Sequence, residues 1–509
     1  MYFHELVAAS DATAEASSRL AKIERLAALL EHVAPDEVDA AIAFLSGEPR
    51  QGRIGIGPAA IQEAKPLSAA PSPRLHLLEV DDAFERIAAT TGPGSSVGRV
   101  QQLRDLLSRA TAAEQDFLVR LLFGELRQGA LEGMLVEAVA RAGQVPAAAV
   151  RRAVMMAGEV APVARALFVE GEQGLARFLV QIFRPVKPML AQPASGVDEV
   201  LAELEPDDLA LEWKLDGARI QVHKAGDEIK VYSRNLREVT AAVPEVSDAA
   251  RALPAAELIL DGEVIALRAD GAPQTFQSTM QRFGRKLDVD RLRAELPLTP
   301  FFFDCLYVDG TALIDQPQID RFRTLASMAP SLTVPSLVRP TREEAVRFVD
   351  ETLKRGHEGV MVKALGSSYA AGRRGRHWVK IKVARTLDLV VLAAEWGHGR
   401  RKGWLSNLHL GARDPVSAGF VMLGKTFKGM TDQMLAWQTT RFLELEVARD
   451  ACTVYLRPEV VVEIAFNDLQ QSPQYPGGLA LRFARVKRYR PDKTAADADT
   501  IDTVRALLP

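Results

Sequence analysis

The sequence predicts a multidomain protein with an all-α first domain, an α+β second domain and a small β-barrel as the third. Apolar residues recur at helical spacing up to about residue 183, as in Leu20, Ile23 and Leu26. Pro185 and Pro188 end this helical pattern. Short strand-like runs with interspersed helices follow, and after residue 386 further strand-like runs accompany a single helix. We therefore expect domains at 1–184, 185–385 and 386–509.

The individual elements are expected from local periodicity and from capping residues. In the first domain helices are expected at 80–90, 100–109, 113–123 and 131–141. In the second, strands are expected at 211–213, 220–224, 229–233, 258–267, 301–308, 359–364 and 378–383, and helices at 239–253, 275–281 and 342–354. In the third, strands are expected at 389–396, 408–411, 421–427, 453–456 and 460–466, with a helix at 432–446 capped by Thr431.

Composition limits the classes of protein that fit. A chain of 509 residues suits about three domains, and 48% hydrophobic residues give each domain a core. The formal charge of −3 is nearly neutral, so a polyanion partner can be indicated only locally. Cys305 and Cys452 lie far apart in apolar runs, which predicts neither a disulfide scaffold nor a zinc site. Glu5 and Asp11 interrupt any signal-peptide core, so we expect a soluble cytoplasmic protein with no membrane contact.

Lys214 is the candidate nucleophile. It lies in the stretch 212–219, which reads Glu-Trp-Lys-Leu-Asp-Gly-Ala-Arg, at a predicted turn between two strands. Gly217 would let the chain turn there and let a ligand approach closely. Because a free lysine is protonated at neutral pH, a nucleophilic lysine needs positive neighbours or a metal to favour the neutral amine. The alternative interpretation is a solvated lysine at a hairpin.

Two downstream motifs add carboxylates and an aromatic side chain. Asp261 and Glu263 are two residues apart in a strand and so share a face, which suits Mg²⁺ or ribose, although such a sequence is often a plain turn. Glu358 repeats the pattern of a carboxylate before a strand. Phe303 lies in an apolar run that is usually core, yet a phenylalanine beside a nucleotide would stack on its base.

Basic residues gather late in the chain. Lys380 and Lys382 alternate with apolar residues on one strand, so an anion should lie over them. No acidic residue occurs from 359 to 387, and Arg373 and Arg374 fall in this stretch, which favours a polyanion site over a solvated face. A second basic cluster at 482–493 suits a triphosphate. In the first domain, the glycine-containing loops before Arg99 and around Arg127 have phosphate-contact chemistry, although each could be a connector.

Six of these motifs occur in an order that resembles the covalent nucleotidyltransferases, and within them the ATP-dependent DNA ligases of the archaeal and eukaryotic replicative kind, closest to the actinobacterial ligase B group. The resemblance covers nearly the whole chain. It implies a helical DNA-binding domain, an adenylation (nucleotidyltransferase) domain and an OB-fold domain. The motifs begin at Lys214, Ser233, Asp261, Phe303 and Glu358, the last of these with 378–382, and end with 490–493.

The resemblance also implies a mechanism and roles. Lys214 would attack the α-phosphorus of ATP, and the AMP would pass to the 5′-phosphate of a nick before the 3′-hydroxyl displaces it. Mg²⁺ is the expected cofactor, with Glu263 and Glu358 as its ligands. Nicked double-stranded DNA and ATP are the expected partners of a monomer that serves DNA replication, repair or recombination together with factors of those pathways. For ATP, the resemblance implies that Glu212 binds the adenine, Phe303 stacks on it, and Arg219 with Glu263 holds the ribose and the nick end. The residues implied for the phosphates are Arg234, Lys380, Lys382, Arg490 and Lys493. The residues expected on DNA are Arg99, Arg127, Arg373 and Arg374.

Two alternatives remain from the sequence. An mRNA capping enzyme or an RNA ligase would share the lysine motif, but neither is expected to carry the helical module. A non-catalytic DNA-end-binding protein should have lost Lys214, Glu263 or Lys382, and all three are present.

Overall fold

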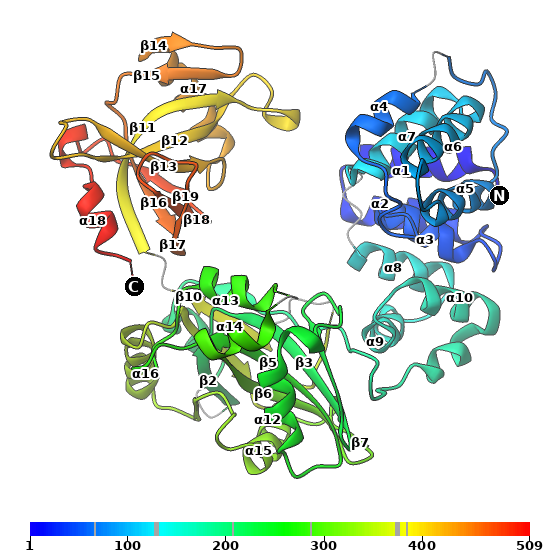
Figure 1. Ribbon diagram of the computed structural model, residues 1–509, viewed down its shortest axis with the longest axis horizontal. Coiled ribbons are helices and arrows are strands. Elements are labelled where there is room, and N and C mark those ends of the chain that lie inside the picture. Colours follow the sequence, from blue (N-terminus) through cyan, green and yellow to red (C-terminus); the bar gives the residue numbers. More distant parts are fainter. Residues whose placement is uncertain are drawn as a thin grey trace.

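The computed structural model describes residues 1–65, 68–126, 132–205, 208–285, 288–371, 377–382 and 385–508. The chain forms a helical part, a middle part with two sheets, and a sheet-rich last part (Figure 1). The helical part and the last part stand on the same side of the middle part and are separate from each other in this view. Among the described residues, no helix is both long enough and apolar enough to cross a lipid bilayer.

The first part is helical because its apolar residues repeat every three or four positions and its helix ends carry capping residues. Thr111 and Glu114 form a capping box at the start of α7, and Gly124 ends that helix with a φ of 68°. Phe3, Phe44 and the aromatic residues around them form edge-to-face contacts in the core. The helices are α1 (Phe3–Glu15), α2 (Arg19–Leu30), α3 (Val38–Ser46), α4 (Pro58–Ala64), α5 (Leu77–Ala89), α6 (Ser95–Arg109), α7 (Ala112–Phe123), α8 (Glu132–Ala142), α9 (Ala147–Ala157), α10 (Ala161–Glu170) and the short 3₁₀ helix η1 (Gly171–Arg177).

The middle part holds two five-stranded sheets, and helices pack against them. One sheet has the order β1-β10-β9-β2-β8 and the other β4-β3-β5-β6-β7; apart from the parallel pair β1 and β10, the paired strands are antiparallel. The strands are β1 (Gln192–Ala194), β2 (Leu209–Lys214), β3 (Ala218–Ala225), β4 (Glu228–Ser233), β5 (Glu257–Ala266), β6 (Leu298–Val308), β7 (Thr311–Ala312), β8 (Ser336–Val338), β9 (Gly359–Ala364) and β10 (Trp378–Lys382). The helices are α11 (Val197–Leu201), α12 (Pro244–Arg251), α13 (Phe276–Phe283), α14 (Val289–Glu295), α15 (Gln318–Met328) and α16 (Arg342–Lys354), with a 3₁₀ turn η3 (Thr240–Ala242).

The expected strands of this part are confirmed within a few residues. The helix expected at 239–253 is instead a 3₁₀ turn followed by α12, because Pro244 occupies the first turn of the helix, where its missing N–H costs nothing. Gly217 lies in the connection between β2 and β3, as expected, and it is also needed for close packing. A Cβ at Gly217 would lie 2.2 Å from the carbonyl oxygen of Val264, so the glycine lets the start of β3 lie close to β5 in the same sheet.

The last part is a strongly curved sheet organised around the long strand β11 (Arg385–Trp396), which pairs with β12, β15 and β16. The backbone N–H of Val486 donates to the carbonyl of Lys428 at 2.9 Å, so the end of β13 meets β19 and the sheet curls back on itself. Thr431 caps α17 (Asp432–Glu444) as expected. Part of the basic run 482–493, which was expected to bind a triphosphate, forms strand β19. The other strands are β12 (Leu405–Arg413), β13 (Phe420–Thr426), β14 (Glu446–Arg449), β15 (Thr453–Leu456), β16 (Val461–Phe466) and β19 (Arg485–Tyr489), and β17 (Asp468–Gln471) pairs with β18 (Leu479–Arg482) as a separate hairpin.

The expected boundary at 184 falls in a segment that packs against the middle part. The N–H of Phe183 donates to Nδ1 of His223 at 2.9 Å, and the hydroxyl of Tyr232 donates to the carbonyl of Phe183 at 2.8 Å. Val186 and Met189 belong to the same apolar core as the helices of the first part. The end of the helical part is therefore held against β3 and β4 of the middle part by hydrogen bonds and apolar packing.

Candidate active site

A cavity of about 510 Å³ opens in the middle part where β2 ends. The strand β2 ends at Lys214, which pairs with Gly359 at the start of β9, and Arg219 in β3 pairs with Glu263 in β5. These pairings bring motifs far apart in the sequence to one place. Eight of the residues expected to bind ATP or to react line the cavity: Glu212, Lys214, Arg219, Arg234, Glu263, Phe303, Lys380 and Lys382.

Lys214 and Lys382 share one carboxylate. The ammonium of each lysine forms an ion pair with Glu358, whose side chain is 10% exposed. Burial acts to raise the pKa of Glu358, but the charges of Lys214 and Lys382 outweigh it and hold that pKa below its ordinary value. Burial and the charge of Lys214 lower the pKa of Lys382. Two cations share this one carboxylate, and ammonium groups of this kind also bind phosphate groups.

A second buried ion pair lies at Glu212, two residues before Lys214 in β2. Glu212 and Lys363 are almost fully buried and lie 2.7 Å apart. Burial raises the pKa of Glu212 to about 7, against the charge of Lys363. The Lys363 ammonium also donates to the carbonyl of Phe303 at 2.8 Å and lies 4.5 Å from the centre of the Trp378 ring. Oε1 of Glu212 has no hydrogen-bond partner in the described part of the chain, so it can accept from a ligand such as an exocyclic amine.

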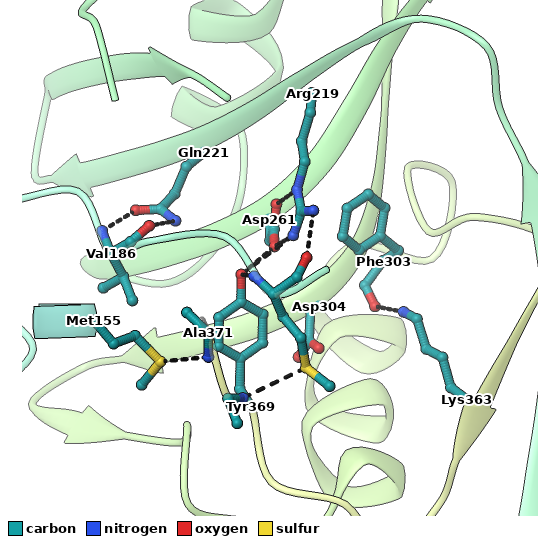
Figure 2. A network of polar contacts seen from close by, with 12 residues as sticks. Met155, Val186, Arg219, Gln221, Asp261, Phe303, Asp304, Lys363, Tyr369 and Ala371 are labelled. Carbon is teal, nitrogen blue, oxygen red and sulfur yellow. Dashed lines mark hydrogen bonds and ion pairs between the residues drawn. The ribbon is translucent and has the colours of Figure 1, made fainter. Parts of the chain in front are cut away.

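Glu263 and Asp261 have different environments although they lie two residues apart in β5. Glu263 lines the cavity, accepts from the N–H of Gly217 at 3.2 Å, and has its pKa raised to about 7 by burial. Asp261 is 1% exposed; Arg219 binds it through two donors at 3.0 and 2.6 Å, and Tyr369 donates to it at 2.6 Å (Figure 2). Asp261 was expected as a metal or ribose ligand, but it does not line the cavity, and its oxygens accept from Arg219 and Tyr369, so it is not placed to bind either.

The last part of the chain reaches the cavity through the hairpin β17–β18. Arg482 donates to Asp216 at 2.9 Å, and its guanidinium lies 3.6 Å from the centre of the Phe276 ring. Asn467, just before β17, donates to Glu358 at 3.4 Å. In Figure 1 the hairpin points from the last part toward β10 and α13. Arg482 was expected only as part of the basic cluster 482–493, with no role of its own, and Asn467 was not expected at the site.

Arg490 and Lys493 are not at this cavity. Both bind Asp388 in β11, at 2.8 and 2.6 Å, and both line a second cavity of about 640 Å³ with Trp437 and Tyr489. The structure therefore does not bring these two expected ATP ligands together with Lys214.

The arginines expected on DNA are only partly described. Arg99 donates to the carbonyls of Thr90 at 2.6 Å and Gly55 at 3.3 Å, so it joins two loops of the helical part. Arg127, Arg373 and Arg374 lie outside the described residues. Their contact with DNA, like that of Arg99, stays a prediction.

The described residues contain no cluster of three or more His, Cys, Asp or Glu side chains that could hold a metal ion. Of the two expected ligands, Glu263 lines the cavity, whereas both oxygens of Glu358 are engaged with Lys214 and Lys382. This donor set fits an ion that arrives on a triphosphate and takes one or two protein carboxylates, which is the usual way in which Mg²⁺ binds with nucleotides.

Comparisons with known proteins identify the family. Residues 188–382 match the model of the ATP dependent DNA ligase domain, 401–493 that of the ATP dependent DNA ligase C terminal region, and 59–140 that of the DNA ligase N terminus. These three matches, in this order and around this cavity, define a multidomain ligase. The chain belongs to the ATP-dependent DNA ligase family.

Relatives support this over the full length. A probable DNA ligase of Anaeromyxobacter sp. (strain Fw109-5) is 60% identical, with 100% of this chain and 98% of the relative covered. A probable DNA ligase of Rhodococcus opacus (strain B4) is 50% identical, with 100% of both chains covered. A solved structure described as Pmar-Lig_Pre shares the fold, with a TM-score of 0.61 at 17% identity, over 96% of this chain and 99% of that one.

Proposed function

We propose that this DNA ligase seals nicks in duplex DNA through a covalent lysyl-AMP, with Lys214 as the nucleophile. The observation that carries the proposal is the set of groups that line one cavity. Lys214 and Lys382 share Glu358, and Glu212, two residues before Lys214 in β2, has an open acceptor. An adenine at Glu212 would direct its α-phosphate toward the lysines.

In the first step the neutral amine of Lys214 attacks the α-phosphorus of ATP. A phosphorus–nitrogen bond forms, the bond between the α-phosphorus and its bridging oxygen breaks, and pyrophosphate leaves while the nitrogen loses a proton to solvent. Phe303 stacks on the adenine, Arg219 and Glu263 hold the ribose, and positive side chains neutralise charge on the phosphates. The positive residues assigned to the phosphates are Arg234, Lys380 and Lys382. Glu263 and Glu358 would hold Mg²⁺, which would supply further charge neutralisation when bound.

In the second step an oxygen of the 5′-phosphate at the nick attacks the lysyl-AMP, and the phosphorus–nitrogen bond breaks. Lys214 is regenerated. In the third step the 3′-hydroxyl attacks the 5′-phosphorus, loses its proton, and releases AMP. The helical part binds DNA mainly through phosphates, and the curled last sheet acts as an OB-fold that closes on the duplex.

The cellular setting follows from the chemistry. A nick-sealing enzyme serves replication, repair and recombination. Cys452 is an exposed free thiol, which suits a reducing compartment, and we place the protein in the cytoplasm as a monomer.

Incubation with ATP labelled at the α-phosphate and Mg²⁺ tests the proposal. Wild-type protein should acquire covalent label and then transfer it to a nicked duplex, and Lys214→Ala should acquire none while it still binds the nick. Lys230→Ala is the matched control, because Lys230 is a lysine of β4 in the same part of the chain that does not line the cavity. Label on Lys214→Ala would overturn the assignment of the nucleophile, and labelling by GTP in place of ATP would indicate a capping enzyme.

A further inference from the structure

The loop after β9 places Tyr369 directly behind the cavity. The side chain is 2% exposed. Its hydroxyl donates to Asp261 at 2.6 Å, accepts from the N–H of Met189 at 3.0 Å, and accepts from Arg219 at 3.3 Å. Figure 2 shows the hydroxyl beside Asp261 and Arg219. One donation and two acceptances use the full capacity of a phenol hydroxyl, so Tyr369 is held in a single orientation.

These contacts form a closed ring of hydrogen bonds. Arg219 binds Asp261 through two donors, Asp261 accepts from Tyr369, Tyr369 accepts from the N–H of Met189, and the carbonyl of Met189 accepts from Arg219 at 2.6 Å. A guanidinium has five N–H donors. The contacts to Asp261, Tyr369 and Met189 use four of them, so the described residues leave one N–H of Arg219 for a ligand.

The ring separates into residues that face the cavity and residues that stand behind it. Arg219 and Met189 line the cavity, whereas Asp261 and Tyr369 do not. Burial and the charge of Asp261 raise the pKa of Tyr369 well above its ordinary value, so the hydroxyl keeps the proton that it donates. A ligand in the cavity would therefore meet Arg219, and the orientation of Arg219 depends on groups that the ligand does not touch.

The loop that carries Tyr369 is itself held in place. The N–H of Ala371 donates to the sulfur of Met155 in α9 at 3.1 Å, and the N–H of Ala370 donates to the sulfur of Met189 at 3.4 Å. The Tyr369 ring packs edge-on against Trp378 with centroids 5.9 Å apart. Because packing and backbone contacts hold the aromatic ring of Tyr369, removal of the hydroxyl alone should leave the aromatic ring in position.

We propose that Tyr369 is a positioning residue for ligation, which fixes Arg219 through Asp261 and Met189 so that the remaining guanidinium N–H meets the nucleotide or the nick end. The proposal rests on the proposed function, which assigns Arg219 to that contact. It adds a residue outside the six motifs, and it makes Asp261 a support for Arg219 and not a metal ligand.

Tyr369→Phe tests the proposal in the full-length protein. The rate of sealing a nick in a single turnover should fall by about tenfold to a hundredfold, because a hydrogen bond to a charged group is lost and Arg219 is less well oriented. The dissociation constant for nicked DNA should change less than about twofold, since most DNA contacts are to phosphates elsewhere. Tyr307→Phe is the matched control: it also removes a tyrosine hydroxyl bound to a carboxylate, Glu257 at 2.9 Å, and Tyr307 does not line the cavity.

A double-mutant cycle separates positioning from a structural role. Because Tyr369 and Asp261 both act by orienting Arg219, the loss of sealing rate in Tyr369→Phe combined with Asp261→Asn should be clearly smaller than the sum of the two single losses, expressed as free energies. Additive losses, or a wild-type sealing rate in Tyr369→Phe, would overturn the proposal. It would also be overturned if Tyr369→Phe lowered the melting temperature and the fraction of active molecules but left the sealing rate of the active molecules unchanged. Failure of the proposed function would look different, because the wild-type protein itself would then form no lysyl-AMP.

Discussion

At the scale of single residues, two buried carboxylates give the cavity its response to pH. Burial raises the pKa of both Glu212 and Glu263 to about 7. Glu212 has Lys363 as a direct ion-pair partner. Within the described ranges, Glu263 accepts a hydrogen bond from the N–H of Gly217 and has no direct ion pair, and the charges of Lys214 and Arg219 act on it at longer range. Glu263 is therefore the better group for a pH test, because its neutral form leaves no direct ion-pair partner behind.

Glu263→Gln should change how stability depends on pH. The pKa of Glu263 is raised from 4.5 to about 7 in the folded protein, so folding favours its neutral form. The contribution of neutral Glu263 to the free energy of unfolding is fully present below the pKa that Glu263 has in the unfolded chain. This contribution is lost as the pH rises through about 7, the pKa in the folded protein. Between about pH 5 and pH 8, wild type should lose roughly 1–3 kcal/mol of stability relative to Glu263→Gln. Melting temperatures of both proteins across this range measure the difference.

Glu344→Gln supplies the control for that measurement. Hydrogen bonds from Thr341 lower the pKa of Glu344, so this carboxylate is ionised throughout the same pH range. Its difference from wild type should stay constant between pH 5 and pH 8. A constant difference for Glu263→Gln as well would show that burial does not raise the pKa of Glu263.

At the scale of elements, contacts of the hairpin β17–β18 hold one face of the last part against the cavity. Arg482→Ala should release it, because this change removes both the ion pair with Asp216 and the stacking on Phe276. The side chains of the pair are only 16% and 28% exposed, so solvent screens them incompletely. We expect the ratio of molecules with the hairpin released from the cavity to molecules with the hairpin bound there to rise by about tenfold. Small-angle X-ray scattering should then show a larger radius of gyration.

Arg485→Ala is the comparison for this change. Arg485 is an exposed arginine in the neighbouring strand β19, and it does not line the cavity. The scattering of Arg485→Ala should match that of wild type. If Arg482→Ala also matched wild type, packing elsewhere would hold the hairpin against the cavity.

The sequence predicted the elements that carry local signals and missed those that depend on tertiary contacts. Lys214 lies at the end of β2 as expected, because apolar alternation ends there and a glycine follows. By contrast, Arg482 lies 266 positions from Asp216, and no local pattern indicates that they meet. Lys363 could have been found, because a lysine within an otherwise apolar strand needs a buried partner such as Glu212. Asp261 was misassigned because alternation gives the face of a residue and not its partners.

At the scale of the whole molecule, the last part of the chain carries two sets of cations, and in this arrangement one set lies at the cavity and the other does not. Arg482 binds Asp216 at the cavity, while Arg490 and Lys493 bind Asp388 and line another cavity. If Arg490 and Lys493 bind the β- and γ-phosphates of ATP, the last part must turn between formation of lysyl-AMP and sealing. The described arrangement would then follow release of pyrophosphate. In it, Arg490 and Lys493 are ion-paired with Asp388 and do not contact the nucleotide cavity.

The double change Arg490→Ala with Lys493→Ala separates these steps. Both side chains would act only while pyrophosphate is the leaving group, so formation of lysyl-AMP should fall by about a hundredfold or more. A nick supplied with AMP already on its 5′-phosphate should be sealed at nearly the wild-type rate, because no pyrophosphate leaves and the contacts of Arg482 are intact. Label incorporation and sealing of the adenylated nick are measured on the same preparation. Equal loss of both activities would instead mean that the contacts with Asp388 stabilise the last part, and a lower melting temperature would accompany that outcome.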